Sequence, residues 1–357
     1  MKIGILKESQ DNRVSMVPAT MKKAKLEQVE FLLESNAGVK ASLPDDTYVE
    51  VAKMTDRLTI FQTADIIVSV VPIAASELSK VKKGTLLISM FAPYVDDSII
   101  DTLQNHGLHG VSMDMIPRTS LAQAMDILSS MAAVAGYKAV LAAANHLPRY
   151  FPMMITAAGS IRPAKVLVLG AGVAGLQAIA TARRLGAMVE AFDVRKAAKE
   201  EVESLGAKFV EVEGAADDTS AGGYAVEQSE EFIKKQRAEV QNRAAKADVI
   251  ITTAQVRGRK APILLPKETV DKMKTGSVVV DLASSTGGNC ELSKDNEIII
   301  HNGVKIIGNS ALASDMPQDA STLFSNNILN LLKLIIKDGE MVLDMENEII
   351  KSALITG

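Results

Sequence analysis

The chain has 357 residues, which at roughly 100–200 residues per domain suggests two or three domains. Apolar residues make up 47% and charged residues 23%, as in ordinary globular proteins, which excludes disordered and fibrous classes. With 39 basic and 43 acidic residues the net charge is −4, so there is no overall basic field for nucleic acid or an anionic membrane.

The N-terminal third of the chain alternates short apolar runs with polar or helical stretches. The opening KIGILKE indicates a buried strand, and Pro18 can open a helix after it. Apolar residues from Leu26 to Leu33 then recur at helical spacing. Further strands are predicted at residues 65–71, 85–90 and 110–115. This alternation is typical of a parallel sheet with crossover helices.

The alternation resumes after an Ala-rich helix predicted at residues 130–144. Strands are then predicted at residues 165–169, 188–192, 208–212, 248–253, 277–281 and 304–307. The small-residue segment 214–223 is expected to be a mobile loop. Residues 321–337 form a helix that is apolar around much of its circumference, and we expect it at the domain boundary or in a dimer interface.

These elements predict two Rossmann-like, doubly wound α/β domains flanking a nucleotide cleft. Residues 1–130 with 325–357 would form one domain, and residues 131–324 the other. The longest uncharged apolar stretch, residues 166–182, spans 17 residues, whereas a membrane helix needs about 20. We therefore predict no direct membrane insertion of this chain and no nucleic-acid partner.

The strongest local signal is a glycine-rich turn between a predicted strand and a predicted helix. Gly170, Gly172 and Gly175 form a GxGxxG motif around Val173, and the next strand ends at Asp193. The first glycine permits a tight turn, the second lets the backbone approach a pyrophosphate, and the third allows close helix–strand packing. The helix N-terminus offers free N–H groups to phosphate. A dinucleotide site is therefore predicted here.

The residues after the next strand bear on which nucleotide binds. Asp193 would accept hydrogen bonds from the adenosine ribose and repel a 2′-phosphate, which favours NAD(H) over NADP(H). Arg195, beyond Val194, works against this preference because arginine can hold a 2′-phosphate. Thr253 and Ala254 follow a later strand and could line the cleft, although ordinary loop roles explain them equally well.

Residues for acid–base or metal chemistry are scarce. The single cysteine, Cys290, cannot form an internal disulfide or a cysteine-rich zinc site, and no motif has metal-ligand spacing, so no metal is predicted. The four histidines fall at positions typical of turns or of the surface: His106, His109, His146 and His301.

A polar row interrupts the apolar segment before the Ala-rich helix. On a helix, Gln123, Asp126 and Ser130 would share one face, with Ser129 close by and Arg118 just upstream. A capping box that begins at residue 119 or 120 explains one or two of these residues but not the whole row. We interpret the row as functional.

Four blocks of sequence together resemble the NAD(H)-binding component of proton-translocating NAD(P) transhydrogenase, in the alanine dehydrogenase superfamily. They are RTSLAQAMDILSSMAAVAGYKAV, the segment around the glycine motif, SVVVDLASSTGGNCE and NNILNLLKL. The resemblance implies a loop that contacts the nicotinamide and orients it towards NADP on a separate component. By position, it implies these catalytic roles for Arg118, Gln123, Asp126 and Ser129.

The same resemblance implies cofactors, partners and location. NAD(H) would bind this chain and NADP(H) its partner, and Tyr224 and Ala225 look like the tip of a loop that closes on the nucleotide. The implied partners are an NADP-binding component, a membrane component and a second copy of the chain. The expected location is a peripheral position in a membrane complex, on its cytoplasmic or matrix side.

Alanine dehydrogenases are similar to the chain in the KIGILKE…NRV…P pattern, and an enzyme of that kind is the alternative function. That resemblance implies a catalytic lysine near residue 70 and a histidine near residue 91, but the chain has VSVVP and SMFAPY there. Hydride transfer between two nicotinamides needs ring apposition and exclusion of water rather than a proton acid or base. A non-catalytic NAD-binding sensor or scaffold is a third possibility.

Overall fold

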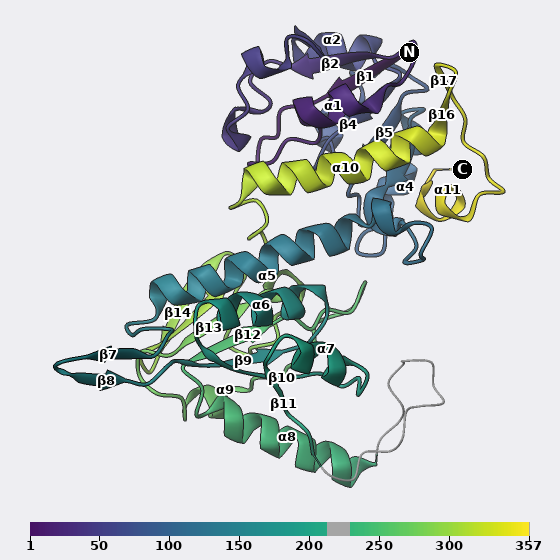
Figure 1. Ribbon diagram of the computed structural model, residues 1–357. Coiled ribbons are helices and arrows are strands. Elements are labelled where there is room, and N and C mark those ends of the chain that lie inside the picture. Colours follow the sequence, from purple (N-terminus) through teal and green to yellow (C-terminus); the bar gives the residue numbers. More distant parts are fainter. Residues whose placement is uncertain (213–228, 357) are drawn as a thin grey trace. The chain divides into compact units, whose positions relative to one another are not determined.

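A computed structural model describes residues 1–212 and 229–356, which divide into two compact units (Figure 1). The first unit combines Met1–Met131 with Ala313–Gly357, and the second is Ala132–Leu312. The second boundary thus falls at residues 312/313, twelve residues before the predicted one at 324/325. The predicted loop 214–223, Tyr224 and Ala225 lie outside the described residues.

The first unit contains a six-stranded parallel sheet in the order β3-β2-β1-β4-β5-β6. Its strands are β1 (Lys2–Ile5), β2 (Glu30–Glu34), β3 (Lys53–Thr55), β4 (Ile66–Val68), β5 (Leu86–Ser89) and β6 (His109–Ser112). Its helices include α1 (Pro18–Ala24), α2 (Arg57–Thr63), α3 (Ala75–Leu78), α4 (Ser98–Asn105), α10 (Pro317–Ile335) and α11 (Glu348–Ala353). The sheet order reverses between β1 and β4, as in doubly wound folds.

One prediction in this unit was wrong. Of the apolar residues from Leu26 to Leu33 that recur at helical spacing, Phe31, Leu32 and Leu33 form strand β2 instead, between β1 and β3. Phe31, Leu32 and Leu33 are all buried, because both faces of a parallel sheet are covered. A short continuous apolar run of this kind fits a buried strand as well as a helix.

The second unit contains a seven-stranded sheet in the order β11-β10-β9-β12-β13-β15-β14. Its strands are β9 (Lys165–Leu169), β10 (Met188–Phe192), β11 (Lys208–Phe209), β12 (Val249–Thr252), β13 (Val278–Asp281), β14 (Glu297–His301) and β15 (Val304–Gly308). Only β14 runs antiparallel to its neighbour. The helices α6 (Val173–Arg184), α7 (Ala198–Ser204), α8 (Glu230–Ala244) and α9 (Lys267–Val270) complete the unit.

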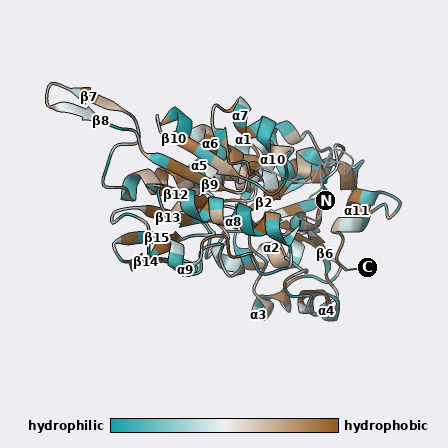
Figure 2. Ribbon diagram, turned by 90° about the horizontal axis from the view of Figure 1, so that it is seen from below, coloured by the Kyte–Doolittle hydropathy of each residue, from teal (hydrophilic) through white to brown (hydrophobic). Residues whose placement is uncertain are grey.

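The central strands of both sheets consist mostly of buried hydrophobic residues, and those of the second sheet are largely brown in Figure 2. This is the composition expected of parallel strands that are covered on both faces. The predicted class, two doubly wound α/β domains with large parallel sheets, is confirmed.

Several short elements complete the chain. The 3₁₀ turns are η1 (Val39–Ala41), η2 (Asp45–Tyr48), η3 (Met113–Met115), η4 (Gln123–Met125) and η5 (Ser284–Thr286). Two hairpins pair β7 (Met154–Thr156) with β8 (Gly159–Ile161) and β16 (Ile336–Lys337) with β17 (Glu340–Met341).

Helix α10 belongs entirely to the first unit, where it lies along α1 (Figure 1). The Ser321 and Ser325 hydroxyls accept hydrogen bonds from the backbone N–H groups of Val14 and Val17 at 2.9 and 3.0 Å. Most of its apolar residues are buried, although Leu323 is 38% exposed, and its main contacts are with α1, η1, η4 and β16 of the same unit. The expectation that it packs at the domain boundary or in a dimer interface is not needed to explain its composition.

Helix α5 (Ile127–His146) begins in the first unit and continues into the second. By length and composition alone, it is the one helix among residues 1–212 and 229–356 that could cross a membrane, and it was not expected to qualify. The core helix of a soluble protein can pass the same test. A side chain at Gly136 would overlap the Ala174 carbonyl oxygen at the start of α6, so α5 packs directly on α6.

The carboxyl group of Glu8, which follows β1, is buried, and we expect it to make the stability of the chain depend on pH. Glu8 accepts hydrogen bonds from the backbone N–H groups of Val70 (2.6 Å) and Val71 (3.2 Å), and burial raises its pKa to about 7 from the ordinary 4.5. The folded chain therefore keeps a proton that the unfolded chain loses between these pH values. The contribution of Glu8 to the free energy of unfolding should fall by about 3 kcal/mol as pH rises from about 4.5 to beyond about 7.

Denaturant unfolding of the wild type and of Glu8→Gln at pH 5 and pH 8 measures this contribution. The neutral glutamine does not titrate, so the stability of the wild type relative to the variant should be greater at pH 5. An equal difference at both pH values would contradict the prediction.

Candidate functional site

The glycine motif forms the turn from β9 into α6, at the strand-order reversal between β9 and β12. Gly170 has a φ of +103°, which only glycine adopts without strain. A side chain at Gly175 would overlap the Gly170 carbonyl oxygen, whereas a Cβ at Gly172 would meet nothing within 4 Å. The turn is thus tightly packed at Gly175 and open at Gly172. Gly172 is the N-cap of α6, the position that a pyrophosphate would need to approach.

Thr253 and Ala254 support this turn from the end of β12. The Thr253 hydroxyl donates to the Gly170 carbonyl at 3.0 Å. The Ala254 N–H donates to the Asn289 side-chain oxygen at 2.9 Å, and the Asn289 amide returns a hydrogen bond to the Ala254 carbonyl at 2.8 Å. Both backbone groups of Ala254 are therefore engaged by the protein.

Asn289 was missed as a positioning residue, although it lies in the block SVVVDLASSTGGNCE, one of the four that carry the family resemblance. Its side chain is fully buried and also donates to the Pro262 carbonyl at 2.8 Å. One carboxamide thus ties together the loops after β12 and β13. Its place in the polar run SSTGGN, shortly after a predicted strand, is the sequence signal that could have indicated it.

Asp193 follows β10 and is linked to the glycine turn. Its Oδ2 accepts the Ala171 N–H at 2.7 Å, and its Oδ1 accepts the Arg195 N–H at 2.8 Å. The Arg195 guanidinium donates to both oxygens, at 3.0 and 3.2 Å, and the carboxylate raises the pKa of this guanidinium. Val194, between the two, has an exposed side chain. Ribose hydroxyls would thus compete with Arg195 for Asp193.

In the first unit, three of the four residues to which the resemblance assigns catalytic roles lie together: Arg118, Asp126 and Ser129. The Asp126 carboxylate accepts the Ser129 N–H at 2.9 Å and the Ser129 hydroxyl at 2.6 Å. The Arg118 guanidinium donates to the Ser129 hydroxyl at 3.2 Å, and its Nε lies 3.6 Å from Asp126. Gln123 lies on η4, three residues before Asp126, and its side chain is exposed.

The shared helical face expected for this row was wrong, and no helix begins at residue 119 or 120, where a capping box was the alternative explanation. Residues 123–125 form a 3₁₀ turn, and α5 begins only at Ile127, so the row does not share one helical face. Asp126 precedes α5 and caps it through the N–H of Ser129, at the usual Asp-x-x-Ser spacing. The cap restrains the carboxylate, while the Arg118 side chain remains 66% exposed and can meet a ligand.

The positions at which alanine dehydrogenases imply acid–base residues are apolar and buried. Val70 and Phe91 have exposed fractions of 1% and 7%, and the Val70 N–H donates to Glu8. Within residues 1–212 and 229–356, no group of three or more His, Cys, Asp or Glu side chains could hold a metal ion.

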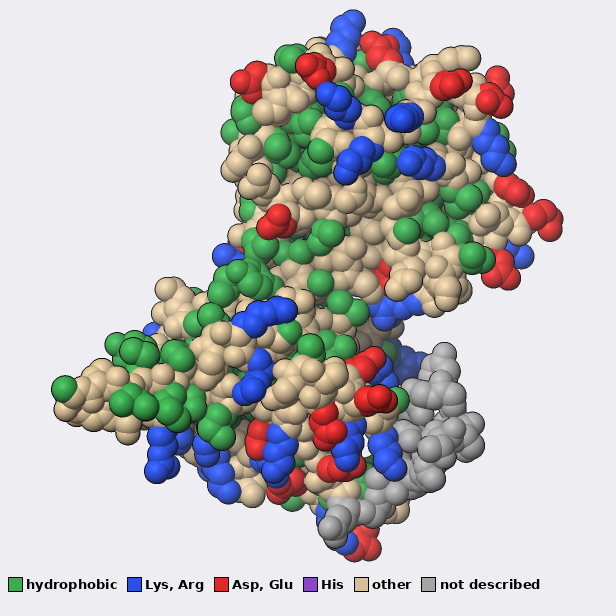
Figure 3. Space-filling model, viewed as in Figure 1, with side chains coloured by type: hydrophobic (Ala, Val, Ile, Leu, Met, Phe, Trp, Pro, Cys, Tyr) green, Lys and Arg blue, Asp and Glu red, His purple; other side chains and the backbone are tan. Residues whose placement is uncertain are grey.

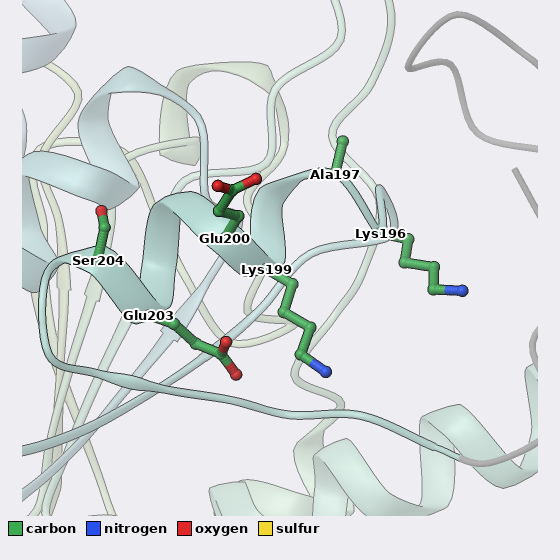
Figure 4. A pocket seen from close by; sticks show the side chains of 6 residues that line it. All are labelled: Lys196, Ala197, Lys199, Glu200, Glu203 and Ser204. Carbon is green, nitrogen blue, oxygen red and sulfur yellow. The ribbon is translucent and has the colours of Figure 1, made fainter. Parts of the chain in front are cut away.

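A hollow lies on α7, directly after Arg195 in the chain (Figure 4). It is lined by Lys196, Ala197, Lys199, Glu200, Glu203 and Ser204. Two lysines and two glutamates balance in charge, and Lys199 pairs with Glu211 at 2.6 Å. This charge balance gives the hollow no preference for an anionic nucleotide, so we assign it no role.

The fold and the glycine turn are those of doubly wound α/β proteins that bind dinucleotides. The chain belongs to the alanine dehydrogenase/PNT family. The model of the family's N-terminal domain matches residues 4–135, and that of its C-terminal domain matches residues 139–357. The family supports binding of a nicotinamide nucleotide.

Relatives of high identity are NAD(P) transhydrogenase alpha subunits. The chain is 44% identical to the first portion of the NAD(P) transhydrogenase alpha subunit of Rhodospirillum rubrum, with 100% of this chain and 96% of the relative covered. It is 43% identical to the NAD(P) transhydrogenase subunit alpha of Cereibacter sphaeroides, with 100% and 70% covered. Subunits of this kind belong to an oxidoreductase of several components.

Solved structures agree with this assignment. A transhydrogenase structure from Sinorhizobium meliloti matches with a TM-score of 0.92 and 40% identity, covering 100% of this chain and 98% of that one. A structure of L-alanine dehydrogenase matches with a TM-score of 0.82 and 24% identity, covering 99% and 94%, which shows the shared fold alone. Alanine dehydrogenases of Methanococcus maripaludis and Mycolicibacterium smegmatis match at only 24% and 26% identity over 82% of this chain, so they are distant relatives.

Proposed function

We propose that this chain is the NAD(H)-binding component of a proton-translocating transhydrogenase. It would exchange hydride between the NADH it holds and NADP⁺ on a partner component. The observation that carries the proposal is the absence of lysine near residue 70 and histidine near residue 91 in a chain that keeps the linked polar group of Arg118, Asp126 and Ser129.

Two groups of residues would serve this reaction. Gly172 and Val173 would receive the pyrophosphate at the N-terminus of α6, and Asp193 would hold the adenosine ribose. Arg118 and Gln123 would orient the nicotinamide, with Asp126 and Ser129 restraining the arginine. Bound NADH supplies the hydride. The chain then needs to align the ring and exclude water, and it needs no proton acid or base.

Mixing the chain with the NADP-binding component of a homologue tests the proposal. NADH should reduce an NADP⁺ analogue in the mixture, and neither component alone should catalyse the exchange. Oxidation of NADH by the isolated chain with pyruvate and ammonia would instead establish an alanine dehydrogenase. Binding of NADH without exchange would indicate a sensor or scaffold.

The proposed assembly adds an NADP-binding component and a membrane component as partners. This chain would lie at the periphery of the complex, on the cytoplasmic or matrix side of the membrane, without inserting itself. The names of the relatives as alpha subunits support the existence of partner subunits.

A second copy of the chain is the further partner that we propose, with hairpin β7–β8 as the contact. The hairpin extends from the second unit in both views and carries hydrophobic side chains (Figures 1 to 3). Met153, Ile155 and Ile161 have exposed fractions of 58%, 76% and 42%. A two-stranded hairpin is marginally stable by itself, so contact with a copy would stabilise it.

Ile155→Asp should convert a dimer into a monomer in sedimentation velocity, because a carboxylate would be buried in the contact. Val49→Asp, at a 69% exposed position of the first unit, is the control and should leave the dimer intact. A dimer that persists in Ile155→Asp would exclude the hairpin as the interface.

The pairing of Arg195 with Asp193 predicts a change in nucleotide preference. Arg195→Ala removes the side chain that competes with ribose hydroxyls for the carboxylate, so NADH should bind about threefold more tightly. The same change removes a cation that could meet a 2′-phosphate, so NADPH should bind about tenfold more weakly. Fluorescence titrations with both nucleotides measure the change.

The matched control is Lys196→Ala, which removes the neighbouring cation and leaves both Arg195 and Asp193 unchanged. Its ratio of NADH to NADPH affinity should stay close to that of the wild type. Parallel changes for both nucleotides in Arg195→Ala would contradict the competition.

A further inference from the structure

Helix α10 presents two asparagine side chains to a single carbonyl group of the turn η4. The Nδ2 groups of Asn327 and Asn330 donate to the Ala124 carbonyl oxygen at 2.9 and 3.2 Å. Asn330 also donates to the Asn326 carbonyl at 2.8 Å, which restrains its side chain. Residues three apart lie on one face of a helix, so one face of α10 donates two hydrogen bonds to one backbone oxygen.

The turn η4, which accepts these hydrogen bonds through Ala124, also contains Gln123. Within the turn, the carbonyls of Ala122 and Gln123 accept the N–H groups of Met125 and Asp126 at 2.8 and 3.2 Å. Ala122 and Met125 are buried, while Gln123 is exposed. The asparagines therefore hold the turn through Ala124 and leave the Gln123 side chain free to meet a ligand.

Stability alone does not explain a carboxamide at position 327. Asn327 lies among the buried residues of α10 with an exposed fraction of 5%, and its Oδ1 is buried without a hydrogen-bond partner. An unsatisfied buried acceptor costs free energy, which a leucine at this position would avoid. The hydrogen bond from its amide to the Ala124 carbonyl of η4 explains the polar side chain better.

We infer that Asn327 and Asn330 are positioning residues for hydride transfer. They fix η4 so that Gln123 keeps its place relative to Asp126, which caps α5. This inference rests on the proposed function, because it assigns the turn a role in orienting the nicotinamide. It adds two residues of α10 that touch neither nucleotide nor reacting atoms.

The test uses the double variant Asn327→Leu/Asn330→Ala in the full chain. Hydrogen exchange of the backbone amides in residues 119–126 should become about tenfold faster, because the turn loses both hydrogen bonds from α10. With the NADP-binding component of a homologue, the rate of hydride transfer should fall about tenfold, since a misplaced ring is a poor donor. The dissociation constant for NADH should change less than about twofold, because the glycine turn lies elsewhere in the chain.

Ser325→Ala is the matched control on the same helix. It removes the hydrogen bond from the Val17 N–H and should lower thermal stability without changing exchange in residues 119–126 or the transfer rate. If hydrogen exchange in residues 119–126 of the double variant equals that of the wild type, the two asparagines do not hold the turn. If hydrogen exchange is faster but the rate of hydride transfer is unchanged, they hold the turn but have no role in the reaction. A wild-type chain that catalyses no transfer would instead contradict the proposed function, and the positioning role in that reaction would fall with it.

Discussion

Gly175→Ala should destabilise the second unit and abolish measurable binding of NADH. The added Cβ would overlap the Gly170 carbonyl oxygen, and a backbone atom cannot move aside as a flexible side chain can. Either α6 or the turn after β9 must shift. We expect a loss of about 3 kcal/mol in the free energy of unfolding and a loss of at least about 100-fold in NADH affinity.

The matched control for this prediction is Gly172→Ala in the same motif. Nothing lies within 4 Å of a Cβ there, and the backbone at φ −75° accepts any residue. This variant should unfold at the same denaturant concentration as the wild type while binding NADH more weakly, because its methyl group faces the proposed pyrophosphate. Equal stability of Gly175→Ala and the wild type would contradict the packing argument.

The glycine turn could be predicted from sequence because its requirements are local. The strand, the three glycines and the helix start lie within a few residues, and backbone sterics fix what each glycine does. The buried strands could be predicted for the same reason, except where the run before Glu34 fitted a helix and a strand equally. Topology then follows from the alternation of strands and helices.

The arrangement of the supporting residues could not be predicted in this way. Asn289 binds a carbonyl 35 residues earlier in the chain, and Asn327 binds one 203 residues earlier. No periodicity connects such positions, because only the tertiary fold brings them together. The cap at Asp126 could have been predicted from the sequence, since Asp-x-x-Ser before an apolar helix is a local signal. The polar row was instead interpreted as one helical face.

Asp126→Asn should reduce the rate of hydride transfer about 100-fold while leaving NADH binding within about threefold of the wild type. An asparagine can still cap α5, because its side-chain oxygen can accept the Ser129 N–H that Asp126 now accepts at 2.9 Å. The variant loses the negative charge beside the Arg118 guanidinium, which lies 3.6 Å away. Arg118 would then be free to leave the place in which it is proposed to orient the nicotinamide.

Asp56→Asn provides the same chemical change at a site that the proposal does not involve. Asp56 caps α2 in the first unit, and its carboxylate accepts the Thr59 N–H at 2.9 Å and the Thr59 hydroxyl at 2.6 Å. The two aspartates thus make the same pair of contacts, so loss of charge at a helix cap is matched between them. Transfer should be unchanged in Asp56→Asn. If both variants transfer hydride at similar rates, Asp126 serves only as a cap and its assignment to the reaction fails.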